Sequence, residues 1–216
     1  MDVKILSDND AKSGFRRGWG FSCLVGDDVV FDTGGDVNTL LFNMYRLSID
    51  FRRIKVIVLS HEHGDHTGGL PVLRELGKVT VFVPRSLSSH LKRRLASQPN
   101  VTLIEVGKAR AIATNIFTTG ELGSFVKEQS LIVKTCNGLT VIAGCSHPGL
   151  EHILETSSTF GELYGVVGGF HGFSQVAVLR RMKLIAPCHC TWLKQELFER
   201  YPASSVRCSA GCIIGL

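Results

Sequence analysis

The strongest chemical signal in the sequence is the run HEHGDH at residues 61–66. Four of its six residues carry side chains that bind metal ions, namely His61, His63, Asp65 and His66. A tight loop at the glycine would aim two imidazoles in one direction and a carboxylate with an imidazole in the other. The spacing therefore predicts two adjacent half-sites with these four residues as metal ligands.

A mixed set of nitrogen and oxygen ligands is typical of a catalytic site, because such a set leaves coordination positions open for water. We predict two divalent ions as cofactors, with zinc first and manganese, iron or nickel as alternatives. Two ions about 3.5 to 4 Å apart could hold a shared hydroxide as a nucleophile. The opposing interpretation is an exposed polar loop, and four potential ligands within six residues argue against it.

The elements that must position this run are apolar strands. The run follows the apolar segment 54–59, and His147, His171 and His189 each lie shortly after another such segment. Side chains at the carboxyl ends of neighbouring strands can converge on one crevice. We therefore expect the three further histidines to belong to the same site as the run.

Apolar periodicity predicts strands that alternate with helices at both ends of the chain and a strand-rich meander in the middle. The predicted strands are 3–6, 21–25, 29–31, 54–59, 79–83, 102–106, 111–118, 130–135, 139–143, 163–167, 184–187 and 206–216. The predicted helices are 37–44, 70–76, 86–96, 150–156 and 174–182, with Asp36 as the cap of the first. This order favours sheets covered by helices on their outer faces.

The composition is that of a globular protein, with 44% hydrophobic and 20% charged residues in a chain of 216. The sequence offers no linker rich in Pro, Gly and Ser, so we predict a single domain over 1–216. No apolar run approaches the roughly 20 residues of a membrane span, and the first residues are unlike a signal peptide. We expect a cytoplasmic protein with no membrane partner, and the sequence leaves its oligomeric state open.

The net charge of +5 is compatible with an anionic small-molecule or phosphodiester substrate and with nucleic acid. A basic stripe with interleaved aromatic residues, which would indicate nucleic acid, is not found in the sequence. The seven cysteines make an odd count, and most of them lie in apolar runs or short clusters. We predict reduced core cysteines, with a thiolate site at Cys188 and Cys190 as the weaker alternative because no second pair has zinc-ribbon spacing.

The pattern His-x-His-x-Asp-His resembles the signature of the metallo-β-lactamase superfamily. The context of the run is also similar, with Asp-Thr-Gly at 32–34 after a strand and an apolar strand at 56–60 leading into the first histidine. The resemblance covers nearly the whole chain. It implies an α/β fold (α+β in some schemes), a four-layer αββα sandwich with a dinuclear site along one edge of its sheets.

Four further segments resemble one branch of that superfamily, the 7,8-dihydropterin-6-methyl-4-(β-D-ribofuranosyl)-aminobenzene-5'-phosphate synthase-like proteins. These segments are GFS at 20–22, GCSHPG at 144–149, GGFH at 168–171 and PCHCT at 187–191. The resemblance assigns His189 to the second metal, together with Asp65 and His66. His147 would complete the first site, although it fits either role.

The sequence departs from the superfamily at the position of the carboxylate that bridges the metals. Many members carry Gly-Asp there, whereas this chain has Gly144-Cys145. Cys145 could bind metal as a thiolate, and a small apolar core residue is the other interpretation. A missing bridging carboxylate would leave the second ion more weakly held.

Four residues outside the ligand set have predicted roles. His171 follows two glycines and could be a proton donor, a substrate contact, an additional ligand or an ordinary loop histidine. Arg16 and Arg17 could contact a substrate phosphate or belong to a solvated loop. Asp32 is predicted to hold the ligand loop through hydrogen bonds, without binding metal itself.

These residues predict a metal-dependent hydrolase acting on an anionic, phosphate-bearing substrate in the manner of a phosphodiesterase. A metal-activated hydroxide would attack, and Asp65 would orient it while holding its metal. Two alternatives stay open at this point. One is a synthase-like transferase, which the resemblance suggests, and the other is a non-catalytic metal or ligand sensor.

Overall fold

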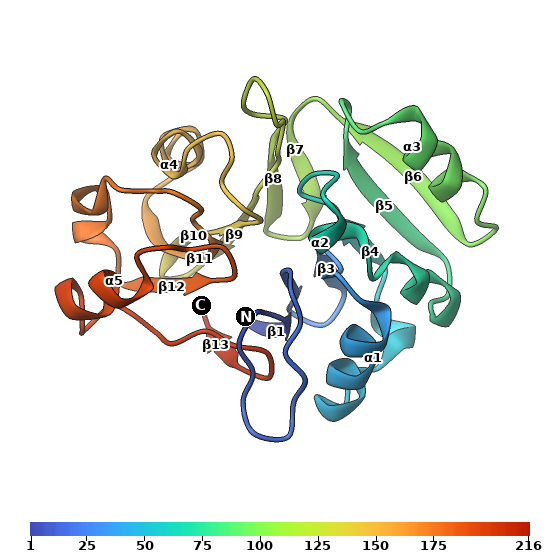
Figure 1. Cartoon of the computed structure of the whole chain (residues 1–216). Helices are drawn as coiled ribbons and strands as arrows, with labels where there is room; N and C mark the ends of the chain where they lie inside the picture. The colour runs from blue at the N-terminus through green and yellow to red at the C-terminus, as the bar shows by residue number, and fades with distance from the viewer. The chain divides into compact units, whose positions relative to one another are not determined.

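The computed structural model describes residues 1–216 (Figure 1). The chain divides into two compact units, of which the first comprises residues 1–107 and 209–215 and the second comprises residues 108–208 and 216. Each unit has its own mixed sheet. Whether both units make up the predicted single domain over 1–216 stays a prediction. None of the helices has the length and apolar character needed to cross a membrane.

The first unit contains seven strands: β1 (Asp2–Ser7), β2 (Ser22–Val25), β3 (Val29–Phe31), β4 (Val56–Val58), β5 (Val79–Pro84), β6 (Val101–Val106) and β13 (Ile213–Gly215). They form one sheet in the order β13-β1-β2-β3-β4-β5-β6. Neighbours from β13 to β3 are antiparallel, and neighbours from β3 to β6 are parallel. The carboxyl ends of β3 and β4 therefore lie at the same edge of the sheet.

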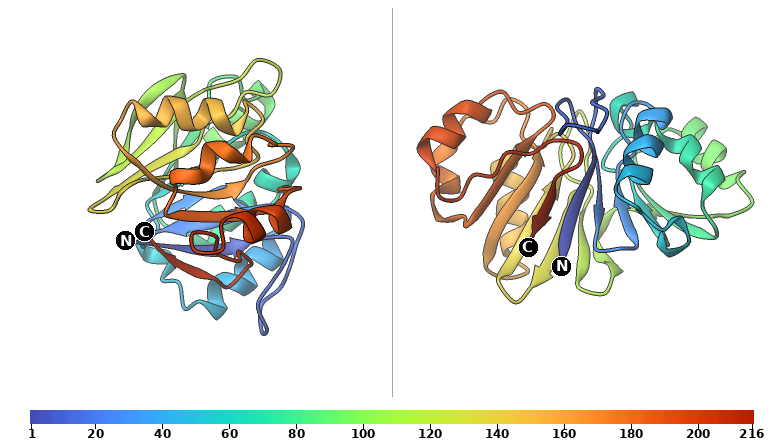
Figure 2. Two further views of the ribbon diagram at one scale, coloured as in Figure 1. Left: turned by 90° about the vertical axis from the view of Figure 1, so that its left-hand side faces the viewer. Right: turned by 90° about the horizontal axis from the view of Figure 1, so that it is seen from below.

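Helices α1 (Val37–Arg46) and α3 (Ser89–Ala96) lie along one face of this sheet (Figure 2, right). Between them and the sheet lies an apolar core that includes Leu40, Met44, Ile57 and Leu91. The unit also has the short helix α2 (Gly64–Thr67) and two 3₁₀ helices, η1 (Phe51–Arg53) and η2 (Leu70–Glu75). Burial of this apolar face fixes the strands whose ends carry the histidine run.

The second unit contains six strands: β7 (Lys108–Ala113), β8 (Ile116–Gly120), β9 (Leu131–Thr135), β10 (Gly138–Ala143), β11 (Leu163–Gly169) and β12 (Leu184–Cys188). They form one sheet in the order β12-β11-β10-β9-β8-β7. β10, β11 and β12 are parallel, and the remaining neighbours are antiparallel. The carboxyl ends of three parallel strands thus meet at one edge.

Two α-helices, α4 (Leu150–Ser158) and α5 (Lys194–Arg200), and the 3₁₀ helix η3 (Val176–Arg181) complete the second unit. Its apolar core includes Val141, Ile153, Val166, Leu179 and Leu197. The strands at 163–167 and 184–187 and the helix at 150–156 are confirmed, with shifts of a residue or two at their ends. Helix α5 was not predicted.

The predicted strand 111–118 is wrong, because the chain reverses inside it. β7 and β8 form an antiparallel hairpin, and Asn115 in the turn adopts a left-handed φ of +62°. Asparagine tolerates this conformation better than most residues, so the turn lies inside a segment whose apolar and threonine residues look like a single strand. The missed strand β7 adds an edge to the second sheet.

Two predicted helices and one predicted strand differ from the structure. Segments 70–76 and 174–182 form the 3₁₀ helices η2 and η3, the first of which has Pro71 in its opening turn. Of the predicted strand 206–216, only β13 is a strand. The chain turns sharply before it at Gly211, which has a φ of +89° and packs against the ring of Phe15.

The prediction that all cysteines are reduced is also wrong, since Cys188 and Cys208 form a disulfide. The segment after α5 runs parallel to β12, with Ser205 bridged to Ile185 and the Val206 amide donating to the Ile185 carbonyl over 2.8 Å. The same parallel pairing, continued three residues along both segments from Ser205 and Ile185, brings Cys208 to Cys188. The remaining five cysteines are reduced: Cys23, Cys136, Cys145, Cys190 and Cys212.

Asp36 caps α1 as predicted, and the cap gives the fold a stabilisation that depends on pH. Its carboxylate accepts a hydrogen bond from the Thr39 amide over 2.7 Å, which lowers the pKa of Asp36. Because the pKa of Asp36 is lower in the folded protein than in the unfolded chain, the cap stabilises the fold fully at pH values above the unfolded-state pKa. This contribution disappears as the pH falls through the pKa of Asp36 in the folded state.

We expect Asp36→Ala to lower the free energy of unfolding by about 1 kcal/mol at neutral pH, because an N-cap acceptor is lost. Asp36→Asn keeps an acceptor and should cost much less. Urea unfolding over a pH series that runs from neutral to below the folded pKa of Asp36 measures both effects. The alanine variant should approach the parent protein at the acidic end of the series; an equal deficit across the whole series would contradict the role given to Asp36.

Candidate metal centre

The histidine run lies between β4 and α2 in the first unit. His61 follows the end of β4, His63 is the N-cap residue of α2, and Asp65 and His66 belong to that helix. The expected tight glycine loop is not what turns the chain, because residue 64 simply starts the helix and an added Cβ there would meet nothing within 4 Å. The short helix itself therefore aims the side chains.

Backbone contacts hold α2 close to the sheet. The Thr33 amide and hydroxyl both donate to the carbonyl of His66, over 2.8 and 2.9 Å. Gly20 packs so tightly against the carbonyl of Asp65 that a Cβ would overlap it, and Gly68 packs in the same way against Gly35. Glycine is needed here for close approach of backbones.

The carboxylate of Asp32, which is completely buried, organises the run. It accepts hydrogen bonds from the Ser60 amide at 2.6 Å, the Ser60 hydroxyl at 2.7 Å and His66 Nδ1 at 2.7 Å. The Ser60 hydroxyl, having donated to Asp32, accepts from His61 Nδ1 at 2.7 Å. Burial raises the pKa of Asp32, and the bonds from His66 and Ser60 oppose that rise.

This network fixes the tautomer of two imidazoles. His61 and His66 both carry their proton on Nδ1, so Nε2 of each ring presents a lone pair. His61 Nε2 faces His63 Nδ1 at 3.0 Å, and His66 Nε2 lies 3.8 Å from Asp65 Oδ2. The ring of His61 lies beside both other imidazoles, with centroids 4.6 Å from that of His63 and 4.3 Å from that of His66. The division of the run into two half-sites stays a prediction.

In the second unit, the buried carboxylate of Glu128 has the role that the carboxylate of Asp32 has in the first unit. Its oxygens accept from the backbone amides of residues 144, 145, 146 and 147 at 2.9 to 3.1 Å. It also accepts from His147 Nδ1 at 2.9 Å, so Nε2 of His147 again presents a lone pair. Glu128 therefore holds both the loop of Cys145 and the ring of His147.

Glu128 was not predicted as a site residue from the sequence. The available signal was a charged residue three positions before the apolar strand β9, where a surface residue is the ordinary expectation. Its partners are backbone amides, which leave no trace in side-chain spacing.

Backbone strain marks the same strand ends. Six non-glycine residues have a positive φ, and four of them are Asp32, Ser146, His171 and His189. Such conformations cost of order 1 to 3 kcal/mol each and persist where the surroundings enforce them. Each of the four is a predicted site residue or the neighbour of one, which supports a functional origin of the strain.

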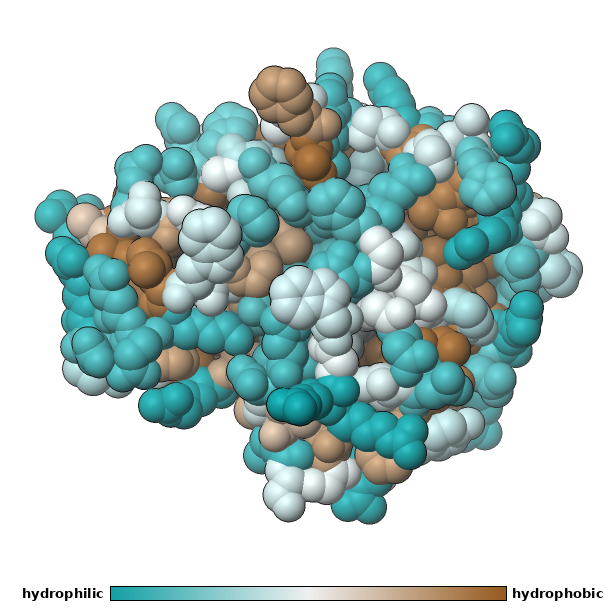
Figure 3. Space-filling model, in the orientation of Figure 1, coloured by the Kyte–Doolittle hydropathy of each residue, from teal (hydrophilic) through white to brown (hydrophobic).

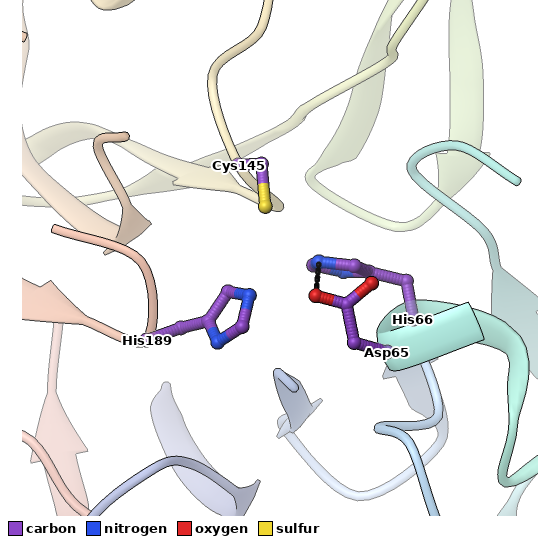
Figure 4. Close-up of side chains that lie close together, drawn as sticks. All are labelled: Asp65, His66, Cys145 and His189. Atoms are coloured by element: carbon purple, nitrogen blue, oxygen red, sulfur yellow. Dashed lines mark ion pairs between the residues drawn. The ribbon is translucent and has the colours of Figure 1, made fainter. Parts of the chain in front are cut away.

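The remaining predicted residues of the second unit lie at the ends of β10, β11 and β12. His189 is buried and follows β12, whereas His171 is exposed and follows β11. The ring of His171 lies 5.3 Å from that of His147 and 5.6 Å from that of Trp192, measured between centroids. Figure 4 shows Asp65 and His66 together on α2, and Cys145 and His189 on their separate loops.

A cavity of about 510 Å³ lies beside His147 and His171 in the second unit. Its walls include the aromatic rings of Phe125 and Phe173 and the carboxylate of Glu151. Phe125 is fully exposed in the loop after β8, where hydrophobic side chains reach the surface (Figure 3). The cavity thus combines apolar walls with two imidazoles, as small-molecule sites do.

Arg16 and Arg17 are both exposed in the loop between β1 and β2. The Arg16 guanidinium lies 4.0 Å over the ring of Phe42, and its backbone is bonded on both sides to Asn43. Their predicted contact with a substrate phosphate stays a prediction. His90 and His152 are exposed on α3 and α4.

The residues present fit divalent metal ions. The candidate ligands are Asp65 and His66 with His61 in the first unit, and Cys145, His147 and His189 in the second. Three of these imidazoles, those of His61, His66 and His147, are oriented by a hydrogen bond at Nδ1, as metal-binding histidines usually are. The site is therefore a candidate metal centre.

Comparison with known proteins identifies the family. Residues 23–170 match the model of the metallo-beta-lactamase superfamily. A 7,8-dihydropterin-6-methyl-4-(beta-D-ribofuranosyl)-aminobenzene-5'-phosphate synthase of Methanocaldococcus jannaschii is 30% identical over 86% of this chain and 83% of its own. The chain belongs to the metallo-β-lactamase superfamily.

Solved structures agree with this assignment. The crystal structure of Tm1679, a metal-dependent hydrolase of the β-lactamase superfamily, matches with a TM-score of 0.84 and 28% identity, covering 100% of this chain and 99% of that one. Zinc-bound PqqB from Methylobacterium extorquens matches with a TM-score of 0.70 and 13% identity over 100% of both chains, which concerns the fold alone. The expected fold class is confirmed: two mixed sheets with helices match the metallo-β-lactamase α/β sandwich fold.

The role of Glu128 can be tested through metal affinity. We expect Glu128→Gln to weaken zinc binding by about 10- to 100-fold, because an amide cannot accept from all five N–H groups that the carboxylate satisfies. Glu155→Gln, at an exposed position on α4, serves as the matched control. Competition with a chromophoric chelator measures the affinity, and circular dichroism checks folding. Unchanged zinc affinity in a folded Glu128→Gln variant would contradict the role given to this carboxylate.

Proposed function

We propose that the protein is a metal-dependent hydrolase of an anionic, phosphate-bearing substrate. The observation that carries the proposal is the set of imidazoles whose Nδ1 atoms are held by Ser60, Asp32 and Glu128. A structural site would consume all ligand positions, whereas this set of nitrogen and oxygen donors leaves room for water and substrate. Membership of a superfamily of mostly metal-dependent hydrolases supports the same activity.

As the family resemblance implies, His61, His63 and His147 would hold one ion, and Asp65, His66 and His189 would hold the other. Ions bound there would supply a hydroxide at neutral pH and polarise a phosphoryl oxygen. Zinc is the first choice, since imidazole and carboxylate both suit it, and manganese, iron or nickel are alternatives. Cys145 stands where many members have the bridging carboxylate, so we propose weaker retention of the second ion.

The protein's own groups would do the rest of the chemistry. Asp65 would orient the attacking nucleophile through its carboxylate while it serves as a ligand. His171, which is exposed and lines the cavity together with His147, would donate a proton to the leaving group or contact the substrate. The cavity would receive the organic part of the substrate between Phe125 and Phe173.

A second candidate function is a synthase-like transfer reaction. It is favoured by the 30% identity with the Methanocaldococcus jannaschii synthase over most of both chains. The same ligands would then hold ions that stabilise a leaving phosphate or pyrophosphate. Release of pyrophosphate that requires a second organic substrate, without hydrolysis of simple diesters, would select this function over hydrolysis.

The proposal is tested by turnover of bis(p-nitrophenyl) phosphate before and after removal of metal. We expect chelation to abolish turnover and added zinc to restore it, and we expect His61→Ala to lower kcat/KM by about 100-fold or more. His90→Ala, exposed on α3 of the same unit, is the matched control and should retain full activity. Turnover that survives chelation, or that His61→Ala retains, would overturn the mechanism. Zinc binding without turnover of any phosphate ester would favour a non-catalytic metal or ligand sensor.

A further inference from the structure

Two reduced cysteines lie side by side at the strand ends of the second unit. Cys145, only 4% exposed, follows β10, and the half-buried Cys190 follows β12. Their sulfur atoms are 3.4 Å apart. The disulfide Cys188–Cys208 is a separate bond, so neither sulfur of this pair is engaged in it.

The backbone is built to allow this approach. β11 lies between β10 and β12, and its last residue, Gly169, lies against both cysteines. A Cβ at Gly169 would fall 2.7 Å from Cys190 Sγ and 3.3 Å from Cys145 Cα, so a larger residue would push the thiols apart. The Cys145 amide donates to the Glu128 carboxylate over 2.9 Å. Gly169 therefore leaves room for the two sulfurs to meet, and Glu128 holds the backbone of Cys145 in place.

We propose that Cys145 and Cys190 are a reversible oxidation site that a hydroperoxide converts into a disulfide. Cys190, the more accessible sulfur, attacks the peroxide oxygen, forming a sulfenic acid and releasing one water or alcohol. The Cys145 thiol then displaces the hydroxyl group, the S–S bond forms, and a second water leaves. Each sulfur gives up one electron and the peroxide takes two, so no other oxidant is needed.

The geometry is close to what the product requires. A disulfide bond is about 2.05 Å long, so the sulfurs must approach by about 1.4 Å, which small changes in side-chain torsions can supply. The bond would remove the Cys145 thiol from the candidate ligands. The cross-link itself is independent of the proposed hydrolase function, whereas its effect on metal binding rests on that function.

The test is peroxide treatment of the full chain, with and without zinc, on a Cys136→Ser background that removes the exposed thiol nearest in sequence. Remaining thiols are alkylated, and the digested peptides are fragmented in a mass spectrometer. We expect a cross-link between Cys145 and Cys190, about 2 Da lighter than the reduced peptides and reversed by dithiothreitol. We also expect zinc to slow its formation and oxidised protein to bind less zinc.

The Cys136→Ser/Cys190→Ser variant is the matched control, and in it Cys145 should stay alkylatable. The proposal is overturned if Cys190 is oxidised to sulfinic acid while Cys145 remains a thiol, or if peroxide links either residue to another cysteine. A cross-link in a protein without hydrolase activity supports this inference and counts only against the proposed function. Metal-dependent hydrolysis with no cross-link refutes this inference alone.

Discussion

The candidate centre depends on a single kind of interaction, a buried carboxylate that orients imidazoles through their Nδ1 atoms. In the first unit Asp32 contacts His66 directly and His61 through the hydroxyl of Ser60. The same carboxylate accepts from the Ser60 amide, so it also fixes the backbone at the end of β4. Because both bonds depend on one group, ring orientation and loop position cannot vary independently.

Glu128 also orients a histidine through its Nδ1 atom in the second unit, but it lies in a different kind of segment. It approaches from the segment before β9 and satisfies four consecutive amides together with the ring of His147. A buried carboxylate is costly unless it is fully hydrogen-bonded, and both carboxylates meet this condition. Each sheet thus has one buried, hydrogen-bonded carboxylate at the edge where its parallel strands end. The positive φ angles at Ser146, His171 and His189 fit a backbone held there against its preference.

The sequence was sufficient to predict most of the strands and the close grouping of side chains in the histidine run, because both depend on local patterns. Alternation and apolar runs identify strands such as β4 and β10, and four donors within six residues identify the run. It was not sufficient where the outcome depends on tertiary contacts. The hairpin at Asn115, the pairing of Cys188 with Cys208 and the role of Glu128 all depend on segments distant in sequence or on backbone partners. Asp32 was predicted in its role because the Asp-Thr-Gly motif marks it, whereas Glu128 has no such motif.

The two buried carboxylates set the tautomers of the candidate metal-binding histidines in the absence of metal. The most direct measurement is a crystal structure of the zinc-loaded protein with anomalous diffraction at the zinc edge. We expect zinc on Nε2 of His61, His66 and His147, with their Nδ1 atoms still bonded to Ser60, Asp32 and Glu128. Zinc on Nδ1 of any of these three rings, or rings released from those partners, would contradict it.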